Sequence, residues 1–165
     1  MDDRAPDQLY AVLIALQGDT LLLPNLAVTE VVSTEGLRRP SGCAPWLAGL
    51  LAWQGRELPV ARFELLNNGA AAPDHRRTRV VIVNAVTARI EGGHYGLIAE
   101  GHPHLVTLNR AALRPAERRP QDSGELVLAR VRVASQEAAI PNLEKLEEAL
   151  AGALAAHGPG AESTA

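Results

Sequence analysis

The sequence predicts a mainly β protein, either a pair of barrels or a sandwich, with one helix at its C-terminal end. Short apolar runs recur along the chain, and turn signals separate them at roughly the 8–12-residue spacing of such folds. The runs are rich in Val, as in residues 80–83, and Val favours strands. Only residues 142–156 carry leucines at a sustained helical spacing.

Composition places the chain among globular proteins. It has 165 residues, a hydrophobic share of 47% and a net charge of -3, so one domain with an ordinary core is expected. The acidic balance gives no overall attraction to nucleic acid or anionic lipid. We expect a domain over residues 9–156, with disordered tails at 1–8 and 157–165.

The single cysteine, Cys43, excludes an internal disulfide framework and a cysteine-cluster metal site. The N-terminus is acidic and polar, without the basic start and apolar core of a secretory signal. No apolar run approaches the ~20 residues of a membrane-spanning helix. A cytoplasmic protein without membrane insertion is therefore expected.

The first predicted element is a hairpin, with strands at residues 9–16 and 20–23 and the turn signal Gln-Gly-Asp between them. Pro24 ends the second strand. Apolar residues at 28, 31 and 32 have helical spacing and predict a short helix over residues 25–32, for which Asn25 is a plausible N-cap.

Residues 44–66, APWLAGLLAWQGRELPVARFELL, predict a second hairpin that is buried on at least one face. An apolar segment at 47–53 meets a polar break at 54–57, and a second apolar segment opens at Leu58. Gly55 can adopt positive φ without steric cost, and Pro59 cannot donate to a ladder, so it belongs at a strand start or edge.

The rest of the chain continues the β pattern to the final helix. Residues 67–78 and 109–124 predict loops. Residues 126–133 alternate as a half-buried strand should, with Arg130 and Arg132 on the face opposite the valines. Asn142 can cap the helix over 142–156. The other strands are expected at 79–86, 94–99, 105–108 and, very short, 140–141.

Candidate chemistry is sparse. The His102-Pro103-His104 pair has a spacing that could hold a metal, but Pro103 favours a turn and no acidic neighbours complete a ligand set, so surface histidines are the better interpretation. Cys43 has no histidine nearby in sequence and is interpreted as a passive thiol. No phosphate-binding or dinucleotide motif is present.

Three basic groups, Arg38-Arg39, His75-Arg76-Arg77 and Arg118-Arg119, lie in separate loops with little aromatic interleaving. Solvated loops explain them better than an RNA surface does. We therefore expect no nucleic-acid partner, no cofactor and no enzyme activity. A binding or scaffolding role is the leading functional class.

The chain resembles the CheW-like domain family, the coupling proteins of bacterial chemosensory arrays. The family signature has a Pro-x-x-x-x-Gly segment, an Asn-Leu-Arg-Gly turn and an Ile-x-Pro-Val-x-Asp-Leu strand, which residues 44–66 resemble. Further similar stretches follow in family order: LYAVLIALQGDTLLLP, VTEVV, VVIV with HYGLIAEG, and IPNLEKLEEAL.

The resemblance implies two intertwined five-stranded SH3-like β-barrels around a shared core, with a short helix after the first hairpin and a C-terminal amphipathic helix. It implies a non-enzymatic adaptor that couples the cytoplasmic tip of a methyl-accepting chemoreceptor to a CheA-type histidine kinase. The pathway is chemotaxis or type IV pilus twitching motility. Because this chain diverges from the family signature, the resemblance also suggests an accessory coupler of a Pil-Chp-type system.

By the same resemblance, the receptor and kinase interface maps to these residues: Val28, Glu30, Val31, Trp53, Gln54, Gly55, Arg62, Val80, Gly96 and His102. Two of them depart from the family pattern, because Gln54 replaces the arginine of the turn and Arg62 replaces the strand aspartate. These two changes remove a guanidinium and reverse a charge, so any ion pair that the arginine and aspartate form with each other or with a receptor is lost here. If both positions lie on a solvated edge, the changes matter little.

Trp53 has two open interpretations, an exposed interface anchor or an inward core residue. Two alternative functions also stay open. One is a decoupled CheW-like adaptor that binds another signalling or motility protein. The other is a small thiol- or metal-dependent enzyme that uses Cys43, His102 or His104.

Overall fold

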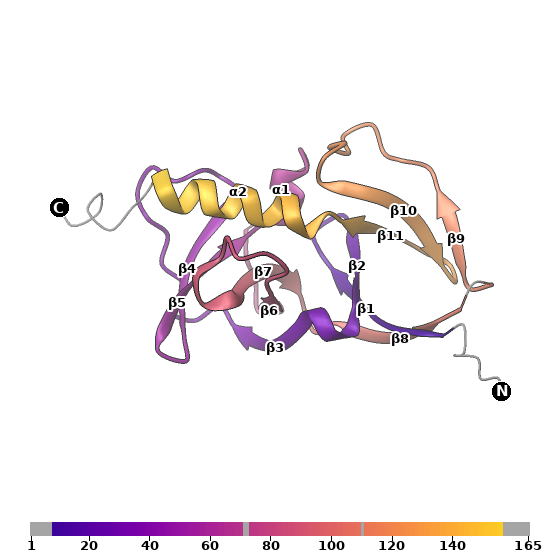
Figure 1. Cartoon of the computed structure of the whole chain (residues 1–165), viewed down its shortest axis with the longest axis horizontal. Helices are drawn as coiled ribbons and strands as arrows, with labels where there is room; N and C mark the ends of the chain where they lie inside the picture. The colour runs from indigo at the N-terminus through magenta and orange to yellow at the C-terminus, as the bar shows by residue number, and fades with distance from the viewer. Residues whose placement is uncertain (1–7, 71–72, 110, 157–165) are drawn as a thin grey trace.

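The computed structural model describes residues 8–70, 73–109 and 111–156, and these ranges form two β-sheets with two α-helices (Figure 1). The mainly β prediction is confirmed. The tails expected at 1–8 and 157–165 lie outside the described residues, except for Gln8, which is exposed and precedes the first strand.

The first sheet has six strands in the order β8-β1-β2-β11-β10-β9. Its strands pair antiparallel, except that β2 and β11 run parallel. N-terminal and C-terminal segments therefore share one sheet. The strand bounds are Leu9–Ala15 (β1), Thr20–Pro24 (β2), His104–Leu108 (β8), Leu113–Ala116 (β9), Val127–Val133 (β10) and Gln136–Pro141 (β11).

The second sheet has five strands in the order β3-β6-β7-β5-β4, with β5 and β7 parallel. Because β8 follows β7 in the chain but joins the first sheet, the two β units are intertwined, as expected. The strand bounds are Val28–Ser33 (β3), Leu47–Trp53 (β4), Arg56–Ala61 (β5), Thr78–Asn84 (β6) and His94–Glu100 (β7).

Alternation along the strands divides the apolar side chains among three clusters. The largest lies between the sheets and includes Val12 of β1, Val81 of β6 and Leu146 of the C-terminal helix. A second cluster belongs to the five-stranded sheet alone, and the third to the six-stranded sheet, where Ala11 contributes. Neighbouring residues such as Ala11 and Val12 point to opposite faces, so the same strand serves two cores.

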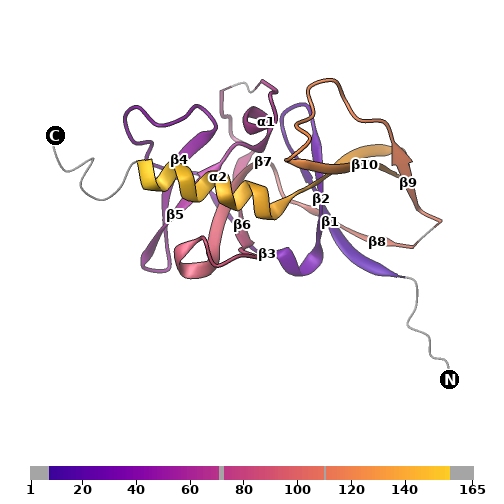
Figure 2. The ribbon, with the colours of Figure 1, turned by 45° about the horizontal axis from the view of Figure 1, so that its top comes forward.

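The C-terminal helix α2 (Leu143–Ala156) runs across the five-stranded sheet from the end of β11, along the top of the view in Figure 1 and in front of the sheet in Figure 2. The Asn142 side chain caps it, accepting a hydrogen bond of 3.2 Å from the backbone N–H of Lys145. Leu146 and Leu150 are fully buried in the shared cluster. Each such leucine contributes about 1.5–3 kcal/mol of burial free energy, so packing holds this helix in place.

The helix expected over 25–32 is present only as the 3-10 turn η1 (Asn25–Ala27), and residues from Val28 onward form strand β3. Pro24 takes the N-cap position, so the expected Asn25 cap is wrong. The register shift at Thr29 lets both Val28 and Val31 pack against the shared cluster, which mimics helical spacing. Pairing with β6 supplies backbone hydrogen bonds that a short helix could not match.

The loop predicted over 109–124 is also partly wrong, because it contains β9, which pairs with β10. This strand makes six strands in a sheet for which the family resemblance implied five. A single turn of helix, α1 (Phe63–Leu66), follows β5 directly and buries Phe63.

The hairpin predicted within residues 44–66 is confirmed as β4 and β5. Gln54 and Gly55 form its two-residue turn with φ values of 49° and 77°, the positive-φ pair of a type I′ turn. Pro59 lies opposite Leu50 of β4, while β7 pairs with β5 only at Val60 and Ala61. The pairing of β5 with β7 therefore does not require the backbone N–H that Pro59 lacks.

Candidate functional site

One end of the five-stranded sheet brings three separate chain segments together. The register pairs Val28 with Val83 and His94 with Asn84, so β3, β6 and β7 have these ends side by side. We call the surface formed there by Glu30, Trp53, Gln54, Gly55 and His94 the rim patch. These residues lie on β3, on the β4–β5 turn and at the start of β7.

The rim patch is held together by the Trp53 indole. Its Nε1–H donates a 3.0 Å hydrogen bond to Oε1 of Glu30, and its ring centroid lies 4.9 Å from that of His94. Because β3 and β4 are the two edge strands of this sheet, the bond joins opposite edges and curls the sheet toward closure. Trp53 is half-buried and packs against the second apolar cluster, so it is neither a fully exposed nor a fully buried residue.

Gln54 and Gly55 project from the rim patch into solvent, and both are exposed. The turn fixes their backbone, so the Gln54 amide is presented on a rigid support. Arg56 follows them and reaches across to the loop before β7, where its Nη1 would lie 2.5 Å from a Cβ placed on Gly92. A glycine at 92 therefore leaves room for this guanidinium.

Val80 and Gly96 do not lie on the surface that the family resemblance implied. Val80 is fully buried, and Gly96 is buried beside it in the adjacent strand β7. A Cβ on Gly96 would lie 2.6 Å from Cγ1 of Val80 and 3.1 Å from Cγ2 of Val60. Both residues pack inside the sheet. Val28 and Val31 are half-buried against the shared cluster.

Arg62 and His102 lie at the opposite end of the sheet from the rim patch. Strand β5 separates Arg62 from the Gln54 turn by six residues, about 20 Å of extended chain. Arg62 forms an ion pair of 2.9 Å with Asp74, and His102 is exposed beyond the end of β7. The ten predicted interface positions therefore lie in three regions. Some are in the rim patch or elsewhere on β3, some are buried inside the sheet, and Arg62 and His102 are at the end of the sheet opposite the rim patch.

The candidate groups for catalysis are not brought together. The Cys43 thiol is 7% exposed, and its Sγ lies 3.7 Å from the carbonyl oxygen of Leu47. His102 and His104 are exposed. Among the described residues, no three His, Cys, Asp or Glu side chains are grouped so that they could hold a metal ion.

A buried ion network joins three segments of the six-stranded sheet and its loops, and the sequence pattern did not reveal it. Arg130 was expected on the open face of β10, yet its side chain is completely buried. It donates to Asp19 at 2.8 Å through both Nη atoms, and to Asp122 at 2.7 Å through Nε and 2.8 Å through Nη2. The hydrogen bonds from Arg130 hold the pKa of the Asp122 carboxyl well below its usual range.

Two buried glutamates were also missed. Glu147 of α2 accepts bonds from the backbone N–H groups of Val86 and Thr87, both 2.8 Å, and from the Thr87 hydroxyl at 2.6 Å. Glu64 of α1 is 5% exposed, and burial raises the pKa of its carboxyl. Helical spacing places Glu147 four residues after Leu143 and three before buried Leu150, on the same face of the helix, which was the available signal for its inward position.

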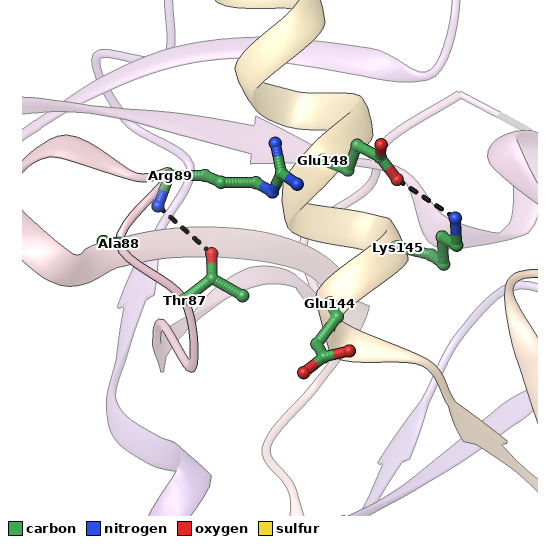
Figure 3. A pocket seen from close by; sticks show the side chains of 6 residues that line it. All are labelled: Thr87, Ala88, Arg89, Glu144, Lys145 and Glu148. Carbon is green, nitrogen blue, oxygen red and sulfur yellow. Dashed lines mark hydrogen bonds and ion pairs between the residues drawn. The ribbon is translucent and has the colours of Figure 1, made fainter.

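A surface cavity of about 600 Å³ lies between α2 and the loop that Glu147 anchors (Figure 3). Lys145 and Glu148 pair across one turn of the helix at 3.3 Å, and the Arg89 backbone N–H donates to the Thr87 hydroxyl. Ala88 and Glu144 complete its lining. Its side chains carry both signs of charge and include no activated nucleophile, and none belongs to the predicted interface.

The fold defines a class, a two-sheet β protein with a C-terminal helix packed in the shared core. Among the described residues, no helix is long and apolar enough to cross a membrane.

The family model of the CheW-like domain matches residues 11–150, most of the chain. This protein therefore belongs to the CheW-like domain family, the non-enzymatic scaffolding and coupling proteins of chemosensory signalling. Among solved structures, the chain is similar to the scaffolding protein TtCheW from Thermoanaerobacter tengcongensis. The two share 16% identity and a TM-score of 0.70, over 87% of this chain and 90% of the other. A search of curated proteins found no match.

Proposed function

We propose that this protein couples the cytoplasmic tip of a methyl-accepting chemoreceptor to a CheA-type histidine kinase, and that the rim patch is a contact surface for this assembly. The observation that carries the proposal is the Trp53–Glu30 hydrogen bond, because it holds an aromatic residue and an exposed turn in one fixed arrangement. A pre-ordered aromatic anchor at a rim loses little entropy on binding. Val28, Val31, Arg62 and His102 are proposed as flanking contacts.

The test is co-sedimentation of the purified protein with a receptor–kinase assembly, comparing Trp53→Ala with Leu128→Ala. Leu128 is 56% exposed on the six-stranded sheet, so its truncation is a matched loss of surface apolar area away from the rim patch. We expect Trp53→Ala to weaken binding by more than about tenfold and Leu128→Ala by less than about twofold. The proposal would be contradicted if the unaltered protein bound neither the receptor nor the kinase. An equal loss of binding in both variants would also contradict it.

A second candidate is a decoupled adaptor that serves another signalling or motility protein. The observation favouring it is that Glu30 and Arg62 already have partners within the chain, Trp53 and Asp74. Gln54→Arg restores the arginine of the family turn and separates the candidates. A gain of about tenfold in kinase or receptor binding favours the decoupled adaptor, whereas full binding by the unaltered protein favours the coupler.

The proposal covers chemotaxis and type IV pilus twitching alike, with the protein acting in the cytoplasm. The departures at Gln54 and Arg62 favour an accessory role beside a standard coupler, as in a Pil-Chp-type system. The same co-sedimentation, repeated with the receptors and kinase of each pathway, identifies the one that is served.

A further inference from the structure

A groove of about 480 Å³ opens at the end of the six-stranded sheet, far from the rim patch. Its lining residues come from β8, β9 and β10 and from the segment that joins β8 to β9, and β8 and β9 lie at the same end of the molecule in Figure 1 and Figure 2. We call it the seam groove. Its walls include Val106 and Thr107 of β8, Ala112 of the joining segment, Arg114 of β9, and Arg132 and Val133 of β10.

Both strands that border the seam groove have an open edge. In the sheet order of the described residues, β8 pairs only with β1, and β9 pairs only with β10. An edge strand presents a row of backbone N–H and C=O groups that can pair with another chain. Here the open edge borders an apolar floor, to which Val106 and Val133 contribute. This combination fits an extended segment better than a compact ligand.

The charges at the mouth of the seam groove are incompletely balanced. Arg114 lies directly opposite Arg132 in the β9–β10 pair, and like charges in that relation are unfavourable. Glu137 on the next strand compensates Arg132 through an ion pair of 3.1 Å. Arg114 has no carboxylate partner among the described residues. One guanidinium is therefore available to an anionic group at the groove.

We propose that the seam groove binds an extended acidic peptide segment of a partner protein, which adds as a further strand to the open edge of β8. A carboxylate of the segment pairs with Arg114, and its alternate side chains, small and apolar, rest on the floor near Val106 and Val133. The surface is separate from the rim patch, and its use does not depend on the proposed function.

The test titrates the full chain, followed by backbone NMR, with three capped hexapeptides that alternate Val with Glu, Gln or Lys. The Glu peptide is expected to bind saturably, with the largest shifts in β8 and β9, and at least about threefold more tightly than the Gln peptide. Arg114→Glu should lower its affinity by about tenfold and raise that of the Lys peptide. Arg76→Glu is the control, because it makes the same charge change at an exposed arginine outside the groove.

Equal loss of Glu-peptide binding in the Arg114→Glu and Arg76→Glu variants would show general charge attraction and would overturn the proposal. So would shifts centred outside β8 and β9, or the absence of saturable binding. Sedimentation of the free protein tests the other occupant, a second copy of the chain. A dimer that Arg114→Glu dissociates would replace the peptide assignment.

Discussion

Replacing Arg130 by Met tests whether the buried ion network stabilises the fold by holding the segments around the six-stranded sheet together. The guanidinium connects three chain segments, namely its own strand, the β1–β2 turn through Asp19 and the loop before β10 through Asp122. Methionine fills much of the space but donates nothing. Asp122 then loses its cation and Asp19 keeps only Arg119, at 3.7 Å, while both carboxylates remain almost fully enclosed, with side-chain exposures of 8% for Asp19 and 0% for Asp122.

The expected cost follows from the four hydrogen bonds that Arg130 donates. Removing one partner of a buried ion pair typically costs 3–5 kcal/mol, because an uncompensated charge remains in the interior. Backbone N–H groups of Thr20 and Arg119 still bond the two carboxylates, so we expect about 3–4 kcal/mol rather than more. Arg130→Lys keeps the charge without the planar fork and should lose about 2 kcal/mol.

Urea unfolding followed by circular dichroism measures these losses. Arg132→Met is the matched control, because Arg132 lies two residues along the same strand but its side chain is 46% exposed and pairs with Glu137. Its loss should stay below about 1 kcal/mol. Similar losses in the two methionine variants would refute the idea that the buried network carries stability beyond that of a surface pair.

The same network predicts a pH dependence. Because Arg130 lowers the pKa of Asp122 in the folded state, the carboxylate contributes stability above its unfolded pKa, near pH 4. That stability is lost as the pH falls through the folded pKa. The free energy of unfolding should therefore drop from pH 5 to pH 2 in the natural protein and drop less steeply in Arg130→Met. Equal slopes would contradict the assignment.

Two further substitutions probe the support of the rim patch and of α2. Gly96→Ala places a methyl group 2.6 Å from Cγ1 of Val80. The overpacking should lower the free energy of unfolding, measured in urea, by about 1–3 kcal/mol. An unchanged free energy of unfolding would show that Val80 can move aside. Glu147→Gln leaves one acceptor oxygen for the three donors at Val86 and Thr87. The free energy of unfolding should fall by about 2 kcal/mol, and amide hydrogen exchange in that loop should become faster. Unchanged exchange would contradict the anchoring role of Glu147.

Local chemistry made the second hairpin predictable. A polar break that contains Gly55 between two apolar segments specifies a tight turn without reference to the rest of the chain. The C-terminal helix was predictable for the same reason, since the Asn142 cap and the leucine spacing are both local signals. These elements needed no knowledge of their partners.

Elements that depend on distant partners were misassigned. Strand β3 is specified by β6, about fifty residues away, and the bulge at Thr29 gives its valines a spacing that imitates a helix. Strand β9 carries Arg114 and Pro115 and becomes a strand only through β10. Short segments of this kind have too little intrinsic preference to be assigned alone.

The candidate site was predictable only in part, because sequence spacing does not report depth. The family resemblance placed Val80 and Gly96 on a contact surface, whereas the sheet encloses them. Alternation along residues 126–133 placed Arg130 on the face opposite the valines, and its two aspartates are 8 and 111 positions away in the chain, so nothing in the sequence indicated their ion pairs. Trp53 could be named in advance as important, but its bond to Glu30 required the fold.

The parallel pairing of β2 with β11 has a consequence for the order of assembly during synthesis. Strands β3 to β7 occupy residues 28–100 without interruption, so the five-stranded sheet has all its strands once that stretch has left the ribosome. The first hairpin must wait for Gln136–Pro141, more than a hundred residues later, before its inner edge is covered. Contacts of such long range form slowly. The end of the chain made first is thus the last to be completed.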